Sequence, residues 1–206
     1  MRTMKMIGFA VSAVALSAAL AACGGEESQH HPETPAPSSA APAAPAPAQG
    51  QSNQADITFA QQMIPHHQQA VEMAKLVAGR TSNQQVIDLA AQIQQAQDPE
   101  IQTMTAWLQQ WGAPVLAPMP GMDHSGHGSM PGMMSAEDMG KLEQSKDTAF
   151  DTMWLTMMVD HHQGAIDMAT TEQQQGASAE AKQLAGQIIT AQQAEIATMN
   201  GLLNKK

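Results

Sequence analysis

Apolar residues recur at helical spacing in four stretches of the chain. In the first stretch Phe59, Met63, Ala70, Met73 and Val77 lie three, four or seven positions apart, which places them on one face of a helix. No stretch alternates between apolar and polar residues with a period of two, so no sheet is predicted. The pattern therefore predicts an all-α protein.

The second half of this helical pattern repeats the first. The segment MIPHHQQAVEMA at Met63–Ala74 returns as MVDHHQGAIDMA at Met158–Ala169, 95 positions later, and the same offset pairs Leu89 with Leu184 without a gap. A helical hairpin has therefore been duplicated. Two hairpins with apolar stripes predict a ferritin-like four-helix bundle over residues 56–204, with the first hairpin at 56–111, a loop at 112–135 and the second hairpin at 136–204.

Capping residues and helix breakers mark the expected ends of the helices. Starts are expected at Asp56, at Ser82 or Asn83, at Asp147 or Asp151, and near Ser178, and ends before Gly79, Gly112 and Gly176. Pro65 and Pro99 fall inside the first two helices. Their counterparts in the second repeat are not prolines, so both helices are expected to continue through them, with a local kink.

Each repeat carries two adjacent histidines between methionines. With about 100° of rotation per residue, the residues Met63, His66, His67, Ala70 and Met73 share one helix face. The second repeat places Met158, His161, His162, Ala165 and Met168 in the same way. Both pairs of imidazoles are therefore predicted to face the core together with thioether side chains.

A carboxylate lies in the apolar stripe of each partner helix. Glu100 falls between Ile93 and Trp107, and Glu195 takes the equivalent place in the repeat. A buried carboxylate is costly unless it is paired. Both glutamates are therefore expected to accept hydrogen bonds from the histidines and to orient the rings, so that loss of His66 or His161 would leave Glu100 or Glu195 without a partner.

Imidazole and thioether groups together are ligands of copper, and thioether sulfur favours Cu(I) and similarly soft ions such as Ag(I). The alternative is a polar cluster in which histidine and glutamate satisfy each other while the methionines fill the core. The duplication of the whole motif favours metal binding. The candidates are Met63, His66, His67, Met73, Met158, His161, His162 and Met168, with Met104 and Met199 on the partner helices.

The stretch between the hairpins contains MPGMDHSGHGSMPGMMS and has no apolar period. It is expected to be a flexible loop, and Ser135 with Asp138 predicts a capping box that starts a short helix. Because its side chains are of the same kinds as the core candidates, it is interpreted as an exposed capture site for the same metal. Its candidates are Met119, Met122, His124, His127, Met130, Met133 and Met134.

The N-terminus predicts export. Arg2 and Lys5 precede the apolar run Ile7–Leu20, and Leu-Ala-Ala-Cys ending at Cys23 resembles a bacterial lipobox. Residues 1–22 are thus expected to be a signal peptide, and Cys23 to carry a lipid that holds the protein at a membrane, facing the periplasm or the cell exterior. The Pro/Ala-rich segment 24–55 predicts a disordered tether.

Charge and composition narrow the partners. Removal of residues 1–22 takes away two of the 9 basic residues and none of the 19 acidic ones, so the formal charge changes from −10 to −12. This balance argues against nucleic acid and favours cations. The single cysteine excludes a disulfide framework and a thiolate metal site.

No catalytic motif is evident in the chain. Di-iron bundles need Glu-x-x-His pairs, but Met63, Ile64, Met158 and Val159 stand three residues before the four histidines. Nucleophile motifs and a phosphate loop are also absent from the sequence. A copper oxidase would need an open coordination position and stays an alternative, as does a structural or chaperone-like module with an architectural His-Glu cluster.

The doubled M-[IV]-x-H-H-x-x-A-x-x-M-A, the Glu-Ile-x-x-Met elements at Glu100–Met104 and Glu195–Met199, and Phe150-Asp151 resemble the bacterial family known as domain of unknown function 305. The resemblance covers Asp56–Leu203 and implies a ferritin-like bundle. It also implies a link to copper, because CopM-type members of the family are exported copper-binding proteins connected with copper resistance. The Met/His loop and the predicted lipid anchor depart from a bare family domain, so ligands cannot all be transferred from relatives.

These observations together predict an exported, membrane-tethered protein that binds Cu(I) or Ag(I). It would buffer the metal or pass it to a copper-exporting or copper-accepting protein. The sequence leaves the stoichiometry and the oligomeric state open.

Overall fold

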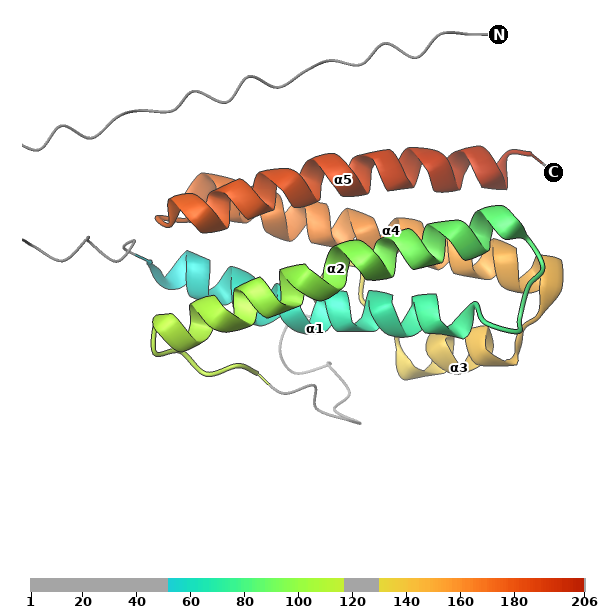
Figure 1. The fold of residues 1–206 in the computed structure, drawn as a ribbon, viewed down its shortest axis with the longest axis horizontal. Coiled ribbons are helices and arrows are strands. Elements are labelled where there is room, and N and C mark those ends of the chain that lie inside the picture. Colours follow the sequence, from blue (N-terminus) through green and yellow to red (C-terminus); the bar gives the residue numbers. More distant parts are fainter. Residues whose placement is uncertain (1–51, 117–129, 206) are drawn as a thin grey trace, which may run out of the picture. The chain divides into compact units, whose positions relative to one another are not determined.

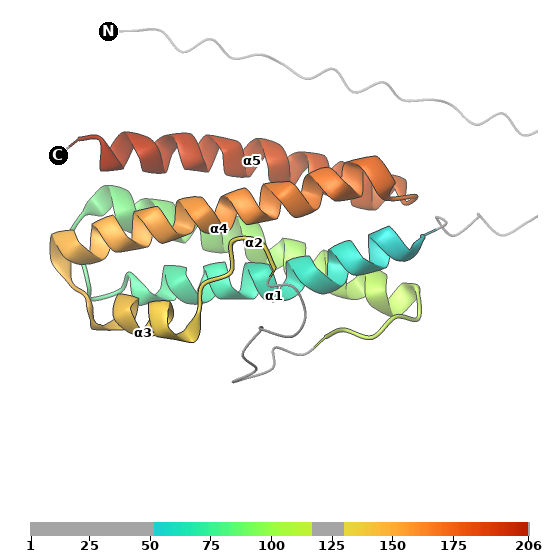
Figure 2. The same cartoon turned by 180° about the vertical axis from the view of Figure 1, so that it is seen from behind.

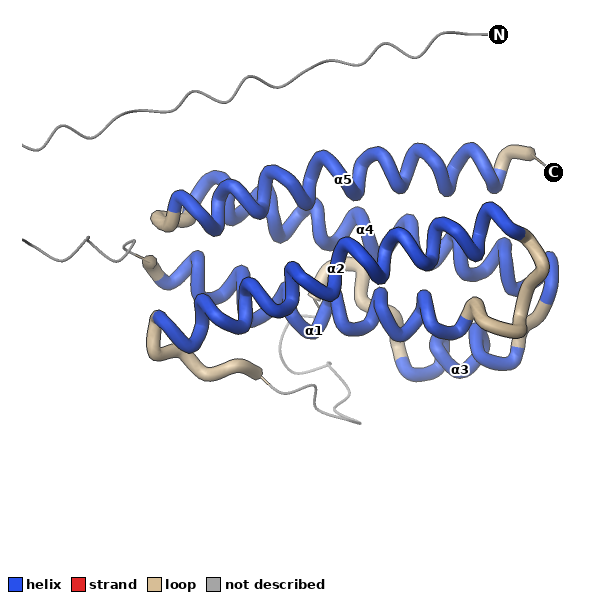
Figure 3. Tube along the Cα trace, in the orientation of Figure 1, coloured by secondary structure: helices blue, strands red, loops and turns tan. Residues whose placement is uncertain are grey.

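The computed structural model describes residues 52–116 and 130–205, and every regular element in these two ranges is a helix. In chain order the helices are α1 (Gln54–Leu76), α2 (Gln84–Gln110), α3 (Ala136–Gln144), α4 (Asp147–Gln175) and α5 (Ala179–Leu203) (Figures 1 and 3). The prediction of an all-α bundle of two hairpins is confirmed. None of these described helices has the length and apolarity needed to cross a membrane. The predictions for Cys23, Met119, Met122, His124 and His127 lie outside the described residues.

Polar side chains cap the starts of four helices. Asn83, Ser135 and Ser178 cap α2, α3 and α5 as predicted. For α1 the predicted cap was wrong by three residues. Asn53 is the cap, because its side chain accepts a hydrogen bond from the backbone N–H of Asp56, while the Asp56 carboxylate accepts one from the backbone N–H of Asn53.

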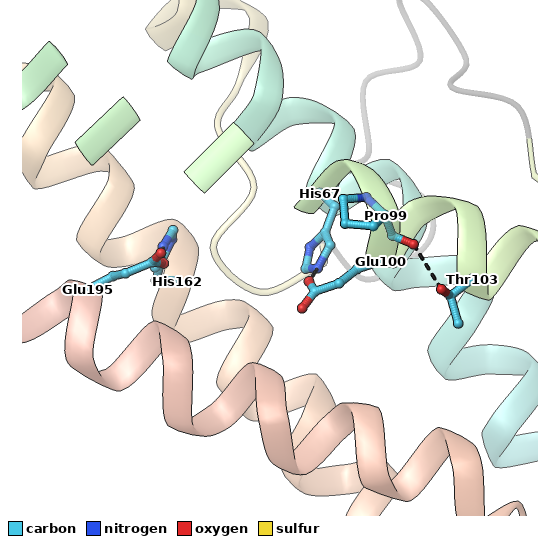
Figure 4. Close-up of polar contacts among 6 residues, drawn as sticks. All are labelled: His67, Pro99, Glu100, Thr103, His162 and Glu195. Atoms are coloured by element: carbon cyan, nitrogen blue, oxygen red, sulfur yellow. Dashed lines mark hydrogen bonds and ion pairs between the residues drawn. The ribbon is translucent and has the colours of Figure 1, made fainter. Parts of the chain in front are cut away.

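Both prolines lie inside helices without ending them, as predicted. Helix α1 continues through Pro65 and helix α2 through Pro99. The hydroxyl of Thr103 donates to the carbonyl of Pro99 over 2.9 Å (Figure 4). Since Pro65 directly precedes His66 and Pro99 directly precedes Glu100, each missing backbone donor lies next to a candidate residue.

The two hairpins pack against each other through α1 and α4, which run antiparallel (Figures 1 and 2). Trp154, early in α4, donates from Nε1 to the carbonyl of Met73, late in α1. His66 and His161 occupy equivalent places in the two repeats, and their rings meet midway along the helices. A local two-fold axis therefore relates the hairpins and passes between these two histidines.

The apolar core consists of two clusters, and the local two-fold axis exchanges one with the other. Equivalent members of the two clusters include Met63 and Met158, Met104 and Met199, and Ile188 and Ile93. Full burial of a side chain of this kind contributes about 1.5–3 kcal/mol. Between the clusters, α1 and α4 carry buried histidines, so a polar layer divides the core in the middle of the bundle.

The short helix α3 covers one half of the face that α1 and α4 share (Figure 2). Leu142 is fully buried in the cluster that contains Met73 and Trp154. Arg80, which follows α1, donates from Nε to the carbonyl of Glu143. Helix α3 is therefore an integral part of the folded domain.

A buried carboxyl pair joins the start of α1 to the turn between α4 and α5. Asp56 accepts hydrogen bonds from the backbone N–H groups of Ala177 and Ser178. Glu172 lies beside it, 1% exposed, and no hydrogen bond of normal geometry reaches either of its carboxyl oxygens. Burial, and then the neighbouring Asp56 carboxylate, raise the pKa of Glu172 to about 8. Glu172 is therefore mostly protonated at neutral pH.

Glu172 should make the stability of the protein fall as the pH rises. Its folded-state pKa lies above the ordinary value of 4.5, so the folded state holds this proton more tightly than the unfolded chain does. The stabilising contribution is fully present below about pH 4.5 and is lost as the pH rises through about 8. We expect Glu172→Gln to remove this dependence, whose slope for one proton is at most about 1.4 kcal/mol per pH unit.

Urea unfolding of the parent and of Glu172→Gln across this pH range tests the prediction. Glu143→Gln is the matched control, because Glu143 is an exposed carboxylate on α3. Equal slopes of unfolding free energy against pH for the parent and Glu172→Gln would contradict the assignment.

Candidate metal centre

Four histidines lie in the middle of the bundle, between the two apolar clusters. His66 and His67 on α1 and His161 and His162 on α4 are all buried. The rings of His66 and His161 are in contact across the local two-fold axis, with centroids 3.8 Å apart and planes inclined at 40°. Both pairs therefore face the core, as the helical periodicity indicates.

The second histidine of each pair is held by a glutamate from the partner helix. His67 donates from Nε2 to Oε2 of Glu100 over 2.7 Å, and His162 donates from Nε2 to Oε2 of Glu195 over 2.6 Å (Figure 4). The expectation that His66 and His161 satisfy the glutamates was wrong. Adjacent helix positions point about 100° apart, so His67 and His162 reach α2 and α5, while His66 and His161 reach each other.

Each glutamate also fixes the tautomer of its histidine. A carboxylate can only accept, so a proton lies on Nε2, and in the neutral ring the lone pair is then on Nδ1. The Nδ1 atoms of His67 and His162 are buried and have no hydrogen-bond partner. The glutamate side chains are 19% and 18% exposed, so their charge stays partly solvated. The pairs therefore present two oriented imidazole lone pairs to the interior.

The segment Met130–Ser135, which we call the strap, crosses the face of α1 and α4 near the middle of these helices (Figure 2). His66 donates from Nε2 to the carbonyl of Pro131 over 3.0 Å. Gln69 holds the strap through two hydrogen bonds with the backbone of Met134. On α4 the strap lies so close to Gly164 that a Cβ there would be 2.0 Å from the carbonyl oxygen of Pro131. The strap is thus docked on both helices.

The docked strap corrects the expectation for the end of the loop between the hairpins. The sequence predicts an exposed, flexible loop for Met130, Met133 and Met134, whereas these residues are half-buried against the bundle. The docking depends on backbone atoms, which leave no periodic pattern of side chains in the sequence.

The histidines on the two-fold axis are uncharged. Burial, and then repulsion from His67, lower the pKa of His66 to about 3, and burial with neighbouring imidazoles holds the pKa of His161 well below its ordinary range. Because the Pro131 carbonyl accepts the Nε2 proton of His66, the lone pair of His66 is on Nδ1. Neither ring nitrogen of His161 makes a hydrogen bond of normal geometry, although the backbone of His66 lies nearby. Neutral imidazole is the form that binds metal ions.

The register between the helices separates the predicted methionines into two groups. The bonds from His67 to Glu100 and from His162 to Glu195 align each antiparallel hairpin. This alignment brings Met104 level with Met63, and Met199 level with Met158, all four buried about one helical turn from the histidines. Met73 and Met168 lie seven residues beyond His66 and His161, about 10 Å along the helix, and are therefore not part of the histidine layer.

Gln97 and Gln192, another repeat-related pair, complete the polar layer. Both are buried, and the side-chain oxygen of each has no hydrogen-bond partner. They lie one helical turn from Glu100 and Glu195 on the inner faces of α2 and α5. The sequence interpretation did not include them, although their identity at the 95-residue offset was an available signal.

Across residues 52–116 and 130–205, no three His, Cys, Asp or Glu side chains are arranged to hold a metal ion among them. A metal in the histidine layer would therefore be bound by imidazole Nδ1 atoms together with thioether sulfur. The unpartnered, neutral imidazoles and the buried methionines one turn away fit a soft ion of low coordination number. They do not fit an ion that prefers oxygen ligands.

The family model described as "Domain of unknown function (DUF305)" matches residues 56–203. A DUF305 protein from Streptomyces coelicolor is similar at 36% identity over 73% of this chain and 93% of that one, with a TM-score of 0.66. CopM in its Cu(II)-bound form is similar at 35% identity over 72% of this chain and 95% of that one, with a TM-score of 0.63, and CopM structures with Cu(I) and with Ag match as well. No curated protein matches the chain.

Gly164→Ala should release the strap. The added Cβ would collide with the backbone of Pro131, which cannot move aside as a flexible side chain can. We expect a loss of about 1–3 kcal/mol in unfolding free energy and faster hydrogen exchange at the amide of Met134, which is bonded to Gln69.

Gly201→Ala is the matched control. Gly201 lies in α5 with nothing within 4 Å of an added Cβ, so this substitution should stabilise the helix by up to about 1 kcal/mol. Chemical denaturation and exchange measurements on both variants decide the matter. A Gly164→Ala protein as stable as the parent, with an equally protected Met134 amide, would show that the strap is not docked on α4.

Proposed function

We propose, on the premise that this chain belongs to the domain of unknown function 305 family, that it is an exported protein that binds Cu(I) or Ag(I) in its histidine layer. In this role it would buffer the metal or hand it on in copper tolerance. The observation that carries the proposal is the concentration of buried imidazole nitrogens without hydrogen-bond partners, namely Nδ1 of His66, His67, His161 and His162 and also Nε2 of His161.

The buried nitrogens without hydrogen-bond partners favour metal binding over a purely structural cluster, in which each ring would be expected to have its hydrogen bonds satisfied. An unpaired buried polar group costs about 1–3 kcal/mol. The bonds to Glu100 and Glu195 would explain His67 and His162 in a structural role. They do not explain His161, which is buried in the centre of the bundle and whose ring nitrogens make no hydrogen bond of normal geometry. A bound ion would give these lone pairs a partner.

The surrounding residues support a soft monovalent ion. In this proposal the imidazoles bind through Nδ1 and the thioethers of Met63, Met104, Met158 and Met199 supply sulfur, a combination that favours Cu(I) over harder ions. Glu100 and Glu195 orient His67 and His162 from outside the metal. CopM, a relative of this chain, has been solved in Cu(II)-bound, Cu(I)-bound and Ag-bound forms.

The segment that precedes the strap would collect the ion. Met119, Met122, His124 and His127 carry the same ligand types, and the half-buried Met130, Met133 and Met134 connect them to the bundle. Thioethers bind weakly one at a time, so such a segment would exchange copper quickly. We also propose that a lipid on Cys23 holds the exported protein at a membrane.

Copper binding is tested by competition titration with a chromophoric Cu(I) chelator under reducing conditions. The parent should retain Cu(I) and prefer it to Zn(II). His161→Leu should weaken Cu(I) binding by about tenfold or more, the equivalent of about 1.4 kcal/mol. It should leave the melting temperature of the metal-free protein unchanged or raised, because a leucine replaces a buried ring that makes no hydrogen bond of normal geometry.

Two further variants sharpen this experiment. His31 is not one of the proposed ligands, so the His31→Leu variant should bind Cu(I) like the parent. Deletion of residues 117–129 keeps the strap and should lower the number of bound copper ions without changing helix content. If His161→Leu holds Cu(I) as tightly as the parent, the histidine layer is not the site, and a parent that loses Cu(I) to a weak chelator refutes the proposed function.

The lipid anchor is tested through Cys23, the only cysteine of the chain. Cys23→Ala should move the protein from the membrane fraction to the soluble fraction, because no other acylation site of this kind remains. Fractionation and metabolic labelling with a fatty acid measure the effect. Membrane association that persists in Cys23→Ala would contradict the anchor.

A further inference from the structure

The two halves of the face shared by α1 and α4 are equivalent in the repeat but are covered differently. Helix α3 covers the half formed by the end of α1 and the start of α4 (Figure 2). Leu142 of α3 is buried in the core there. The other half contains a cleft of about 440 Å³, lined by the start of α1 and the end of α4 and reaching Pro131 of the strap.

The difference between the halves is visible in the sequence. Helix α3 directly precedes α4. Pro47 stands 95 positions before Leu142, so the residues that precede α1 carry no apolar anchor that matches Leu142. Nothing among the described residues takes the place of α3 over the second half.

Three side chains that could bind a metal ion follow one another along α4, from the cleft toward the middle of the bundle. Glu172 is 1% exposed, and neither carboxyl oxygen has a hydrogen bond of normal geometry. Met168, 7% exposed, lies one helical turn closer to the middle of the bundle, and His161 lies two turns beyond Met168. Glu172 and Met168 both line the cleft, and its far wall includes Pro131, whose carbonyl accepts the hydrogen bond of His66.

The covered half lacks this series of ligands. The repeat equivalent of Glu172 is Val77, a buried apolar residue of the core. The repeat equivalent of Met168 is Met73, which is fully buried in the cluster that α3 covers. At this repeat position a carboxyl group therefore lies on the half with the cleft, although packing alone would be served by a valine, as it is at Val77.

We infer that this cleft is the entry route for copper, in which Glu172 and Met168 form a transient binding site before the ion reaches the imidazoles. The inference rests on the proposed function. The Asp56 carboxylate beside Glu172 supplies negative charge that attracts the cation. Glu172 releases its proton when it binds the ion, and the thioether accepts the soft ion after it has lost its water. The two groups lie on one face of α4, so the ion moves along a single helix toward His161.

The rate of Cu(I) loading tests this route in the full chain. Three substitutions should slow loading: Thr171→Trp, which places a large ring at the cleft, Glu172→Gln, which removes the carboxyl ligand, and Met168→Leu, which removes the sulfur. We expect loading about tenfold slower, at the lower end of what charged clefts contribute to association rates. The equilibrium affinity for Cu(I) should stay close to that of the parent, because the final ligands are unchanged.

Matched controls separate the cleft from general effects of these substitutions. Thr170→Trp adds the same bulk at an exposed position of α4 that does not line the cleft, Glu143→Gln removes an exposed charge on α3, and Met139→Leu removes a sulfur on the covered half. All three should load copper at the rate of the parent. Stopped-flow mixing with a chromophoric Cu(I) complex measures each rate.

Two results would overturn the route. Thr171→Trp and Glu172→Gln could load as fast as the parent, or Glu172→Gln could lose equilibrium affinity without a change in rate, which would make the cleft part of the final site. A parent that binds no copper at all would instead refute the proposed function, so the two failures can be told apart.

Discussion

The burial of two uncharged imidazoles on a local two-fold axis is the constraint on which the rest of this structure depends. A charged ring would be expensive at this depth, and burial accordingly lowers the pKa of both His66 and His161 and favours the neutral rings. A neutral ring still has an N–H that needs an acceptor. For His66 the acceptor is a backbone carbonyl of the strap. The strap can reach that place because Gly132 and Gly164 remove the side chains that would collide with it.

The other two histidines, His67 and His162, have their Nε2 protons accepted by glutamates of the partner helices. These glutamates, Glu100 and Glu195, remain partly exposed, so no unpaired charge is buried. The two histidines of a pair therefore differ in kind, although they are adjacent in the sequence. One ring is oriented by a carboxylate from the partner helix, and the other meets its repeat equivalent on the axis. In each pair a lone pair remains directed into the layer between the two apolar clusters.

Periodicity in the sequence was sufficient wherever side chains repeat along a helix. It predicted the four long helices, the two hairpins, the buried histidines and a glutamate partner for histidine. It did not predict which histidine of a pair contacts Glu100. Adjacent helix positions point in different directions, and the choice depends on which side of α1 packs against α4 and which against α2. The strap was missed because its docking uses the carbonyl of Pro131 and the backbone of Met134. The carboxyl pair of Asp56 and Glu172 was missed because it joins residues more than 100 positions apart.

Duplication explains the symmetry of the histidine layer, and divergence of the repeats explains why its two halves are covered differently. Two identical halves, each covered by a helix such as α3, would seal the histidine layer on this face. Two open halves would expose both apolar clusters to water. Within residues 52–116 and 130–205, α3 covers one half and the other half contains a cleft, and the residues diverge accordingly, with Val77 under α3 and Glu172 at the cleft. The core is therefore symmetric while its cover is not, and in the proposed route this difference directs an ion from the cleft at the end of α4 to the histidines on the local two-fold axis.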